Sequence, residues 1–523
     1  MIKNFNLIRK PKLRRAKIDR SHRRLTSMDM FLLYPTLVED CIPGDHFTMG
    51  LEMVCRMNPL VVPILDEISI STQYFFVPYR LLWDDFENYI TGGRDGKYTA
   101  DIPRHSREPT VDYTPGSLWD HLGFNTEKPG FTIKKWPIKF PWRAYNLIWS
   151  EYYRDQNLLE EIEDLDEIPS GNQNLRKRAW AKDYFTSALP WQQRGEAQAF
   201  PISGNLNAVW DIGNFSSQSG SPPGNIIHNN VGMPGFSNGQ ISSTAVQNSA
   251  PYLKGIFDNN TVDMSEAVTF GVDDLRFGVQ LQRYMERLAR VGSRYTEFLR
   301  GIFGVNPKDD RMQRPEFIGS VRSPIIISEV LQTSSSDTTS PQGNMAGHGI
   351  VADRTFAGKY FVREHGCIMG ITSIMPKTMY KDGIERVWFK DSKWDWFLPQ
   401  FVDLSEQAII KEELYNYNEG FGKPIHGYQG RYDEYRYKPS TVHGLFKDDE
   451  AFRQWHLARD FTNGAPPPEL NQDFIYPTDE EMQDMKRMMA VRTEPAFLVS
   501  IGNKVHATRP MPWAAEPGRM DHN

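Results

Sequence analysis

The sequence predicts a mainly β protein, a sandwich of antiparallel strands interrupted by long helical and loop insertions. Two long alternating segments between Ile42 and Pro78 indicate strands with one buried face. Strand-like segments return at 323–332, 360–375 and 495–505, so the chain begins and ends in β structure. One decorated sandwich explains this order better than three separate domains, although a length of 523 residues alone suggests about three.

The first alternating segment runs from His46 to Asn58, and Val54 is its one apolar residue out of step. Its alternating apolar residues are Phe47, Met49, Leu51, Met53, Cys55 and Met57. A Pro-rich connection leads to a second segment that ends at Pro78, where Phe75 and Val77 add apolar groups to the opposite side. The main apolar face of this second strand holds Ile64, Ile68, Ile70, Tyr74 and Phe76.

Helical spacing of apolar residues predicts helices at 80–90, 142–158 and 273–303, the last with a break at Gly292. Residues 91–137, rich in Gly, Pro and charge, predict a long insertion. The second helix is expected to pack through a stripe of Tyr145, Ile148, Trp149 and Tyr152. The third carries Arg276, Arg283, Arg287, Arg290, Arg294 and Arg300.

The charge of the chain is unevenly distributed. Residues 1–24 hold ten basic residues and one acid, Asp19, so this arm carries +9; because the whole chain carries −6, the remainder carries −15. A basic arm on an acidic body is typical of proteins that contact a polyanion or an acidic partner, and a solvated, disordered tail is the alternative. The ten basic residues are Lys3, Arg9, Lys10, Lys12, Arg14, Arg15, Lys17, Arg20, Arg23 and Arg24.

One internal segment differs from the rest in composition. Of the 60 residues from 201 to 260, 32 are Gly, Ser, Asn or Pro, and residues 212–253 carry no formal charge. Such a segment cannot build much core. We therefore expect a surface contact loop over about 202–262, with a flexible linker between two domains as the alternative.

Motifs of catalysis and cofactor binding are missing from the sequence, which has no GxxxxGK[ST], GxGxxG, HExxH or GxSxG pattern. The three cysteines, Cys41, Cys55 and Cys367, are unclustered, which indicates a reduced compartment without a disulfide framework. We expect no enzyme activity, no cofactor and no metal. No apolar segment approaches the roughly 20 residues that cross a bilayer, and no secretory signal follows the basic N-terminus.

Ten short blocks stand in order along nearly the whole chain. They are Asp19-Arg20-Ser21-His22, Ile42-Pro43-Gly44-Asp45, FFVPYRLLW (75–83), RAYNLIWSEYYRDQNL (143–158), DYFTSALPWQQRG (183–195), GSRYTEFLRGIFGV (292–305), QRPEFIGS (313–320), YDEYRYKPS (432–440), WHLARD (455–460) and Thr508-Arg509-Pro510-Met511-Pro512. In this order they resemble the major capsid protein of the Microviridae. These are small icosahedral bacteriophages with single-stranded DNA, and the gokushovirus branch matches best.

The resemblance implies an eight-stranded antiparallel jelly-roll β-sandwich, here a single domain at 25–523 behind the arm at 1–24. It implies a structural protein that self-assembles through pentamers into a T=1 icosahedral shell of 60 copies around a circular single-stranded DNA genome. DNA and a small basic core protein line such shells, so the arm is expected to face one of them. Pilot and scaffolding proteins are the expected assembly partners. Assembly is expected in the bacterial host cytoplasm, and the protein in the virion, without membrane insertion.

In gokushovirus-like members, a long variable insertion forms protrusions at the three-fold axes. The counterpart here is the segment at 202–262, which we expect to take part in attachment to a host surface receptor. Its candidate contact residues are Asn214, Phe215, Asn225, Ile226, Ile227, Asn229, Asn230, Phe236 and Asn238.

Two other functions remain open. A carbohydrate-binding or carbohydrate-active β-sandwich would stack Trp119, Trp388, Trp394 and Trp396 on sugars, and an active one needs a carboxylate pair. A nucleic-acid-binding protein would have the arm as its main functional element. The −15 charge of the body argues against this second function, since it repels the polymer everywhere except at the arm.

Overall fold

The computed structural model of the chain divides into two compact units, Met1–Gln192 together with Ala289–Asn523 as one and Gln193–Leu288 as the other. The structure describes residues 14–94, 97–130, 132–193, 208–209, 235–237, 240–242, 261–262, 272–290, 313–331, 345–404, 406–417, 425–461 and 469–514.

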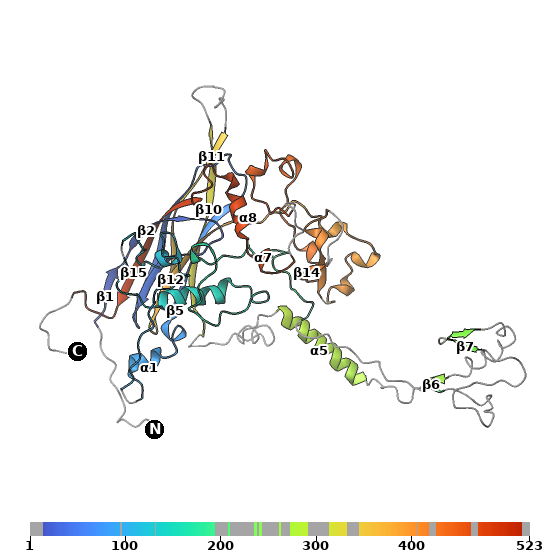
Figure 1. The fold of residues 1–523 in the computed structure, drawn as a ribbon, viewed down its shortest axis with the longest axis horizontal. Helices are drawn as coiled ribbons and strands as arrows, with labels where there is room; N and C mark the ends of the chain where they lie inside the picture. Colours follow the sequence, from blue (N-terminus) through green and yellow to red (C-terminus); the bar gives the residue numbers. More distant parts are fainter. Residues whose placement is uncertain are drawn as a thin grey trace, which may run out of the picture. The chain divides into compact units, whose positions relative to one another are not determined.

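The first unit is built on one antiparallel sheet (Figure 1). Its strand order is β1-β15-β4-β11-β10-β5-β12-β3, and β2 pairs with the same edge of β15 as β1, so nine strands occupy eight positions. This confirms the predicted mainly β, jelly-roll-like fold. The strands are β1 (Ala16–Asp19), β2 (His22–Met28), β3 (Tyr34–Cys41), β4 (His46–Met57), β5 (Ile68–Pro78), β10 (Glu316–Leu331), β11 (Met345–Phe361), β12 (Gly366–Pro376) and β15 (Phe497–Arg509).

Strand β4 confirms the alternation read from the sequence. Its six alternating apolar side chains, from Phe47 to Met57, are buried, whereas Val54 points to the other face and is 42% exposed. The C-terminal strand β15 runs beside β4 from the pair Phe497–Met57 to the pair Thr508–His46. The first long strand is therefore paired along its length with residues 440 to 462 positions away in sequence.

The opposite face of β5 is covered by helical insertions. Phe75 and Val77 are buried there, and the Phe75 ring lies 4.7 Å from that of Tyr152. The predicted helix at 142–158 is shorter than expected: α3 (Phe140–Ile148) continues into a π-helical turn that ends at Tyr153. The turn ends where the hydroxyl of Tyr153 binds the Gln73 side chain on β5. Tyr145 and Ile148 of the predicted stripe are buried in the core, and Trp149 and Tyr152 pack against it.

Other expectations need correction. The predicted helix at 80–90 is a 3-10 turn (Tyr79–Leu81) followed by α1 (Phe86–Thr91). The predicted strand at 360–375 is the end of β11 and most of β12, because the chain turns between Phe361 and Gly366. Further elements are α2 (Leu118–His121), β13 (Gln407–Ile410), β14 (Ile425–Gln429), α7 (Gln472–Ile475), α8 (Asp479–Met485), and the 3-10 turns Asn172–Asn174, Arg386–Trp388, Lys393–Asp395, Pro399–Phe401, Lys411–Glu413, Asp433–Tyr435, Gly444–Phe446, Arg453–Trp455 and Lys486–Met488.

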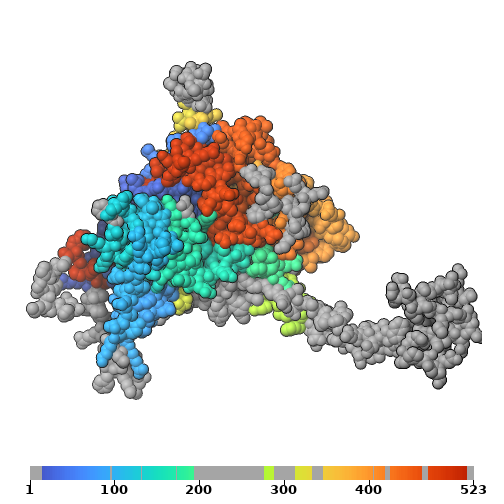
Figure 2. Space-filling view, in the orientation of Figure 1, coloured from blue at the N-terminus to red at the C-terminus, as the bar shows by residue number. Residues whose placement is uncertain are grey.

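The segments outside the sheet form much of the visible surface of the first unit. In Figure 2, residues between β5 and position 193 (light blue to green) and between β12 and β15 (orange to red) hide most of the sheet on this face. All eleven residues of β12 are buried. The sheet is therefore a scaffold, and the insertions supply the surface on this side.

In the second unit the structure describes two small strand pairs and one helix, whose last two residues, Ala289 and Arg290, already belong to the first unit. The helix α5 (Val272–Arg290) agrees with the predicted helix as far as Arg290, while Gly292 and the rest of that prediction lie outside the described residues. Phe277 on α5 is 69% exposed, so it does not pack as its spacing suggested. The strand pairs are β6 (Ala208–Val209) with β9 (Thr261–Val262), and β7 (Gly235–Ser237) with β8 (Gln240–Ser242).

Side chains join the two ends of the large sheet. Asn503 on β15 donates to the main-chain oxygen of Thr36 on β3 at 2.9 Å. Arg509, at the end of β15, donates to the Glu39 carboxylate at 3.0 Å, and Arg20, between β1 and β2, pairs with the same carboxylate. These five residues form what we call the seam. The seam shows that the sheet is curled, because it connects the last strand in the order, β3, to strands at the other end.

The seam continues into the turn between β3 and β4. Asp45 is fully buried; it accepts a hydrogen bond from the amide of Ile42 at 3.0 Å and lies 3.5 Å from Nε of Arg509. Burial raises the pKa of the Asp45 carboxyl above its usual range. Gly44 has φ +95°, a conformation that favours glycine. Three of the blocks that carry the family resemblance, those beginning at Asp19, Ile42 and Thr508, therefore meet at one place.

Glu39→Gln should destabilise the protein strongly, because it leaves Arg509 buried without its main carboxylate. The side chains of Glu39 and Arg509 are only 4% and 10% exposed, and breaking such a pair costs about 3 kcal/mol of unfolding free energy. Denaturant unfolding measures this loss. The matched control is Glu52→Gln, whose partners Arg354 and Lys504 are exposed, with an expected loss below about 1 kcal/mol. Equal losses in the two variants would contradict the role of the seam.

Candidate functional site

An exposed cluster of aromatic rings combines three residues of the insertion between β12 and β13 with one residue, Tyr435, that follows β14. Trp394, Trp396, Phe397 and Tyr435 are 51%, 59%, 49% and 48% exposed. The Nζ atom of Lys390 connects two of them, 4.0 Å from the Trp396 ring centroid and 2.7 Å from the Tyr435 hydroxyl. The ring centroids of Phe397 and Tyr435 lie 6.1 Å apart. We call these four aromatic residues the aromatic surface.

The aromatic surface is held in place by backbone contacts beneath it. Tyr432, which is 2% exposed, donates its hydroxyl to the main-chain oxygen of Trp396 at 3.1 Å and accepts from the amide of Leu398 at 3.3 Å. Ser392 and Asp395 cap the short turn that carries Trp394. The rings are thus presented to solvent by a fixed backbone. Large exposed aromatic groups of this kind mark contact surfaces in proteins.

One of the four tryptophans proposed to stack on sugars in the carbohydrate alternative, Trp119, is buried. Trp119 is 1% exposed, and its indole N–H donates to the main-chain oxygen of Asn125 at 2.9 Å. It packs edge-on against Tyr113 and His105, inside the core. The expectation that it stacks on a sugar was wrong.

Six of the ten basic arm residues lie in the described part of the chain. Arg24 is half-buried and donates to the main-chain oxygen of His121 at 2.8 Å, and Arg20 belongs to the seam. Both therefore have structural partners. The side chains of Arg14, Arg15, Lys17 and Arg23 are exposed. The remaining predicted residues, Lys3, Arg9, Lys10 and Lys12, lie outside the described residues.

Of the residues predicted for the attachment loop, only Phe236 lies in a described element. It is in β7, where it pairs with Ile241 of β8. The other eight, Asn214, Phe215, Asn225, Ile226, Ile227, Asn229, Asn230 and Asn238, lie outside the described residues.

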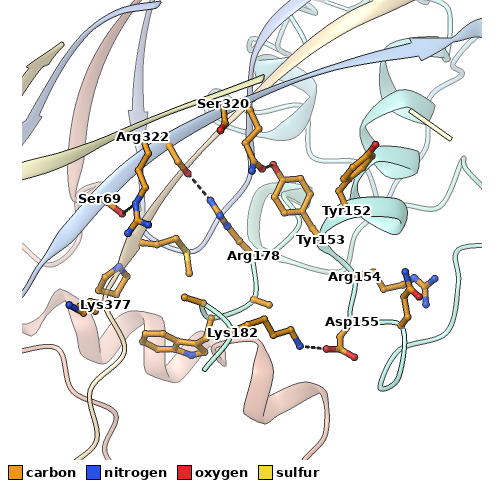
Figure 3. Close-up of a pocket in the computed structure, with 18 of the residues that line it drawn as sticks. Ser69, Tyr152, Tyr153, Arg154, Asp155, Arg178, Lys182, Ser320, Arg322 and Lys377 are labelled. Carbon is orange, nitrogen blue, oxygen red and sulfur yellow. Dashed lines mark hydrogen bonds and ion pairs between the residues drawn. The ribbon is translucent and has the colours of Figure 1, made fainter. Parts of the chain in front are cut away.

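The structure also contains a cleft that was not predicted from the sequence. It lies between the face of β5 that carries Ser69, Ser71 and Gln73, strand β10 and residues 178–182 (Figure 3). Its volume is about 730 Å³. Among its lining residues, five are basic and one, Asp155, is acidic. The only signal in the sequence is the short basic run Arg176-Lys177-Arg178, which by itself is not specific. The five basic residues are Arg154, Arg178, Lys182, Arg322 and Lys377.

The described residues offer no sign of a metal centre or a membrane-spanning helix. They contain no group of three or more histidine, cysteine, aspartate and glutamate side chains placed to hold an ion. None of their helices combines the length and the apolar character that spanning a bilayer requires. All three cysteines are buried as free thiols.

Comparison with known proteins gives a consistent result. A family model described as "Capsid protein (F protein)" matches residues 7–519. The chain is 33% identical to the capsid protein VP1 of Chlamydia phage 1, over 99% of this chain and 98% of that protein. It is 33% identical to VP1 of Bdellovibrio phage phiMH2K, over 94% and 92% of the two chains. The VP1 of Spiroplasma virus 4 is 28% identical, over 99% and 97%.

These matches confirm the resemblance carried by the ten blocks, and with it the expectation of a structural protein of the virion rather than an enzyme. The chain belongs to the F-protein family of Microviridae capsid proteins, alongside the VP1 proteins of gokushovirus-type phages.

Proposed function

We propose that this protein assembles through pentamers into a T=1 shell of 60 copies that encloses a circular single-stranded DNA genome. The observation that carries the proposal is the match to capsid proteins along almost the whole chain. A closed shell repeats each contact by symmetry, so interfaces that are individually weak act cooperatively. Scaffolding and pilot proteins are the partners we propose for assembly, and the jelly-roll body at 25–523 is the shell-forming domain.

The aromatic surface supports self-association as a contact between copies. Its four rings are large, preorganised by Tyr432 and exposed in the single chain. Aromatic residues are enriched in interface centres, where they contribute most of the binding free energy. Burying these rings against a second copy would remove them from water in the shell.

The exposed arm residues support an inward-facing role at the genome or a small basic core protein. Arg20 and Arg24 anchor the arm to the sheet, so we assign the neutralisation of phosphate charge to the residues before them. The proposed division is an anchor at residues 20–24 and a charged tail at residues 1–17.

The segment at 202–262, whose residues 212–253 carry no formal charge, is the proposed three-fold protrusion and host-attachment element, with 91–137 as a second insertion. The composition of residues 202–262 supports the attachment role, because Asn, Ser and Gly provide adaptable hydrogen bonding without a fixed charge. A host surface protein or glycan is the proposed receptor.

The double variant Trp394→Ser with Trp396→Ser should fold normally but assemble poorly. Loss of two central aromatic contacts should reduce the association constant by well over tenfold, since such residues contribute about 2 kcal/mol or more each. Native mass spectrometry measures pentamers, and thermal unfolding checks the fold. The control is Trp513→Ser, which removes a ring outside the surface that is even more exposed (75%) than Trp394 and Trp396. Normal pentamers in the double variant would exclude this surface from the interface.

Neutralising Arg9, Lys10, Lys12, Arg14 and Arg15 to glutamine should lower the DNA content of particles more than the yield of pentamers. The reason is that these charges contact phosphate, not another subunit. The ratio of absorbance at 260 and 280 nm in purified particles reports the packaged DNA. The control neutralises five exposed, ion-paired residues of the body, namely Arg107, Arg354, Arg436, Lys438 and Lys504. If pentamers fail first, the arm is an interface element instead.

Deletion of residues 212–253 should leave particles that form but do not adsorb to host cells. The deleted segment carries no charge and adds little core, so shell assembly should not need it. Adsorption is measured by depletion of particles from a host culture, and electron microscopy verifies the shells. Normal infection by the deleted particles would rule out the attachment role.

A further inference from the structure

We propose that the cleft between β5, β10 and residues 178–182 binds phosphate groups of single-stranded nucleic acid, as a second anionic-ligand site independent of the N-terminal arm. This inference rests on the proposed function in one respect, the identity of the polymer as single-stranded nucleic acid. The site itself is argued from the side chains that line it (Figure 3).

Two arginines reach into the cleft from different elements without a carboxylate partner among the described residues. Arg178 donates to the hydroxyls of Ser71 and Ser373, at 2.7 and 2.5 Å. Arg322 on β10 donates through Nε to the hydroxyl of Ser69 at 3.1 Å. These acceptors are neutral, so hydrogen bonding positions both guanidinium groups but leaves both charges uncompensated.

The arrangement is electrostatically unfavourable when the cleft is empty. Burial lowers the pKa of Arg178, and the positive charge of Arg322 lowers it further. Within the described part of the chain, Arg154, a third lining residue, donates to the main-chain oxygens of Ser150 and Leu159 and has no carboxylate partner. Three guanidinium groups thus line one cavity, in a body whose net charge outside residues 1–24 is −15. An anion in the cleft would compensate them.

The two lysines of the cleft do not need such a ligand. Lys182 pairs with Asp155, and Lys377 pairs with Glu67 at 3.3 Å. The unpaired positive charge is therefore concentrated in the arginines. A guanidinium group matches phosphate oxygens with two parallel hydrogen bonds, which makes arginine well suited to phosphate.

The size of the cleft favours a nucleotide chain over a single small anion. A volume of about 730 Å³ is in the range of cavities that hold drug-sized ligands. The three arginines come from separate segments, namely β10, the residues around 178 and the turn after α3. Successive phosphates of one strand supply several negative charges at once, and the hydroxyls of Ser69, Ser71 and Ser320 add neutral hydrogen-bonding groups.

The test compares full-length protein, freed of nucleic acid, with its Arg322→Gln variant. A fluorescent oligothymidine is titrated at several salt concentrations. Arg322→Gln should weaken binding about tenfold, equivalent to about 1.4 kcal/mol, and should reduce the slope of log affinity against log salt by about 0.7 for one lost phosphate contact. Arg178→Lys keeps the positive charge but cannot donate two parallel hydrogen bonds to one phosphate. It should therefore weaken binding with a smaller change in slope.

The control is Arg107→Gln, which removes an exposed arginine that already pairs with Glu127. It should leave affinity and slope unchanged, and thermal unfolding verifies that all variants are folded. The arm is intact in each protein, so a failure here leaves the proposed role of the arm standing.

Two results would overturn the proposal. If Arg322→Gln weakens binding of thymidine monophosphate or inorganic phosphate but not of the oligonucleotide, the cleft is a site for a free phosphate compound. If Arg322→Gln changes the binding of neither the oligonucleotide nor the small phosphate compounds but lowers the yield of particles, the arginines pair with carboxylates of a protein partner.

Discussion

The buried carboxylate of Glu39 is the interaction on which the rest of the fold depends. It receives Arg509 from the last strand and Arg20 from the arm, while Asn503 binds the backbone of β3 nearby. These contacts join the two ends of the strand order and so hold the curled sheet closed. Glu39 and Arg509 are 470 positions apart, so most of the chain must fold before the pair can form.

In this fold, the strands of the curled sheet form the core, with β12 buried throughout, and the segments between the strands form the surfaces to which we assign function. The aromatic surface comes from the segment between β12 and β13 and from the turn after β14, and the basic cleft lies where the segment after α3 crosses β5 and β10. Hydrogen bonds position the side chains or backbone of each surface, from Tyr432 beneath the aromatic rings and from the serines of β5 beside the arginines.

The sequence allowed prediction of what depends on local pattern. The alternation of β4, including the outward Val54, and the packing stripe of α3 were correct because burial of one face imposes a period on nearby residues. Partners distant in sequence leave no such pattern. For this reason the structural roles of Arg20 and Arg24, the burial of Trp119 and the arginine cleft could not be predicted. Blocks of family sequence indicated the function, and three of them proved to meet at the seam.

Sedimentation of the protein from infected cells, with negative-stain imaging of the fastest fraction, tests self-assembly into a shell most directly. All phage and host partners are present in such cells, so assembly does not depend on an omitted factor. We predict pentamers and closed icosahedral shells that contain the full chain. A stable monomer of 60.4 kDa as the sole species would contradict the assignment of this protein to a self-assembling shell.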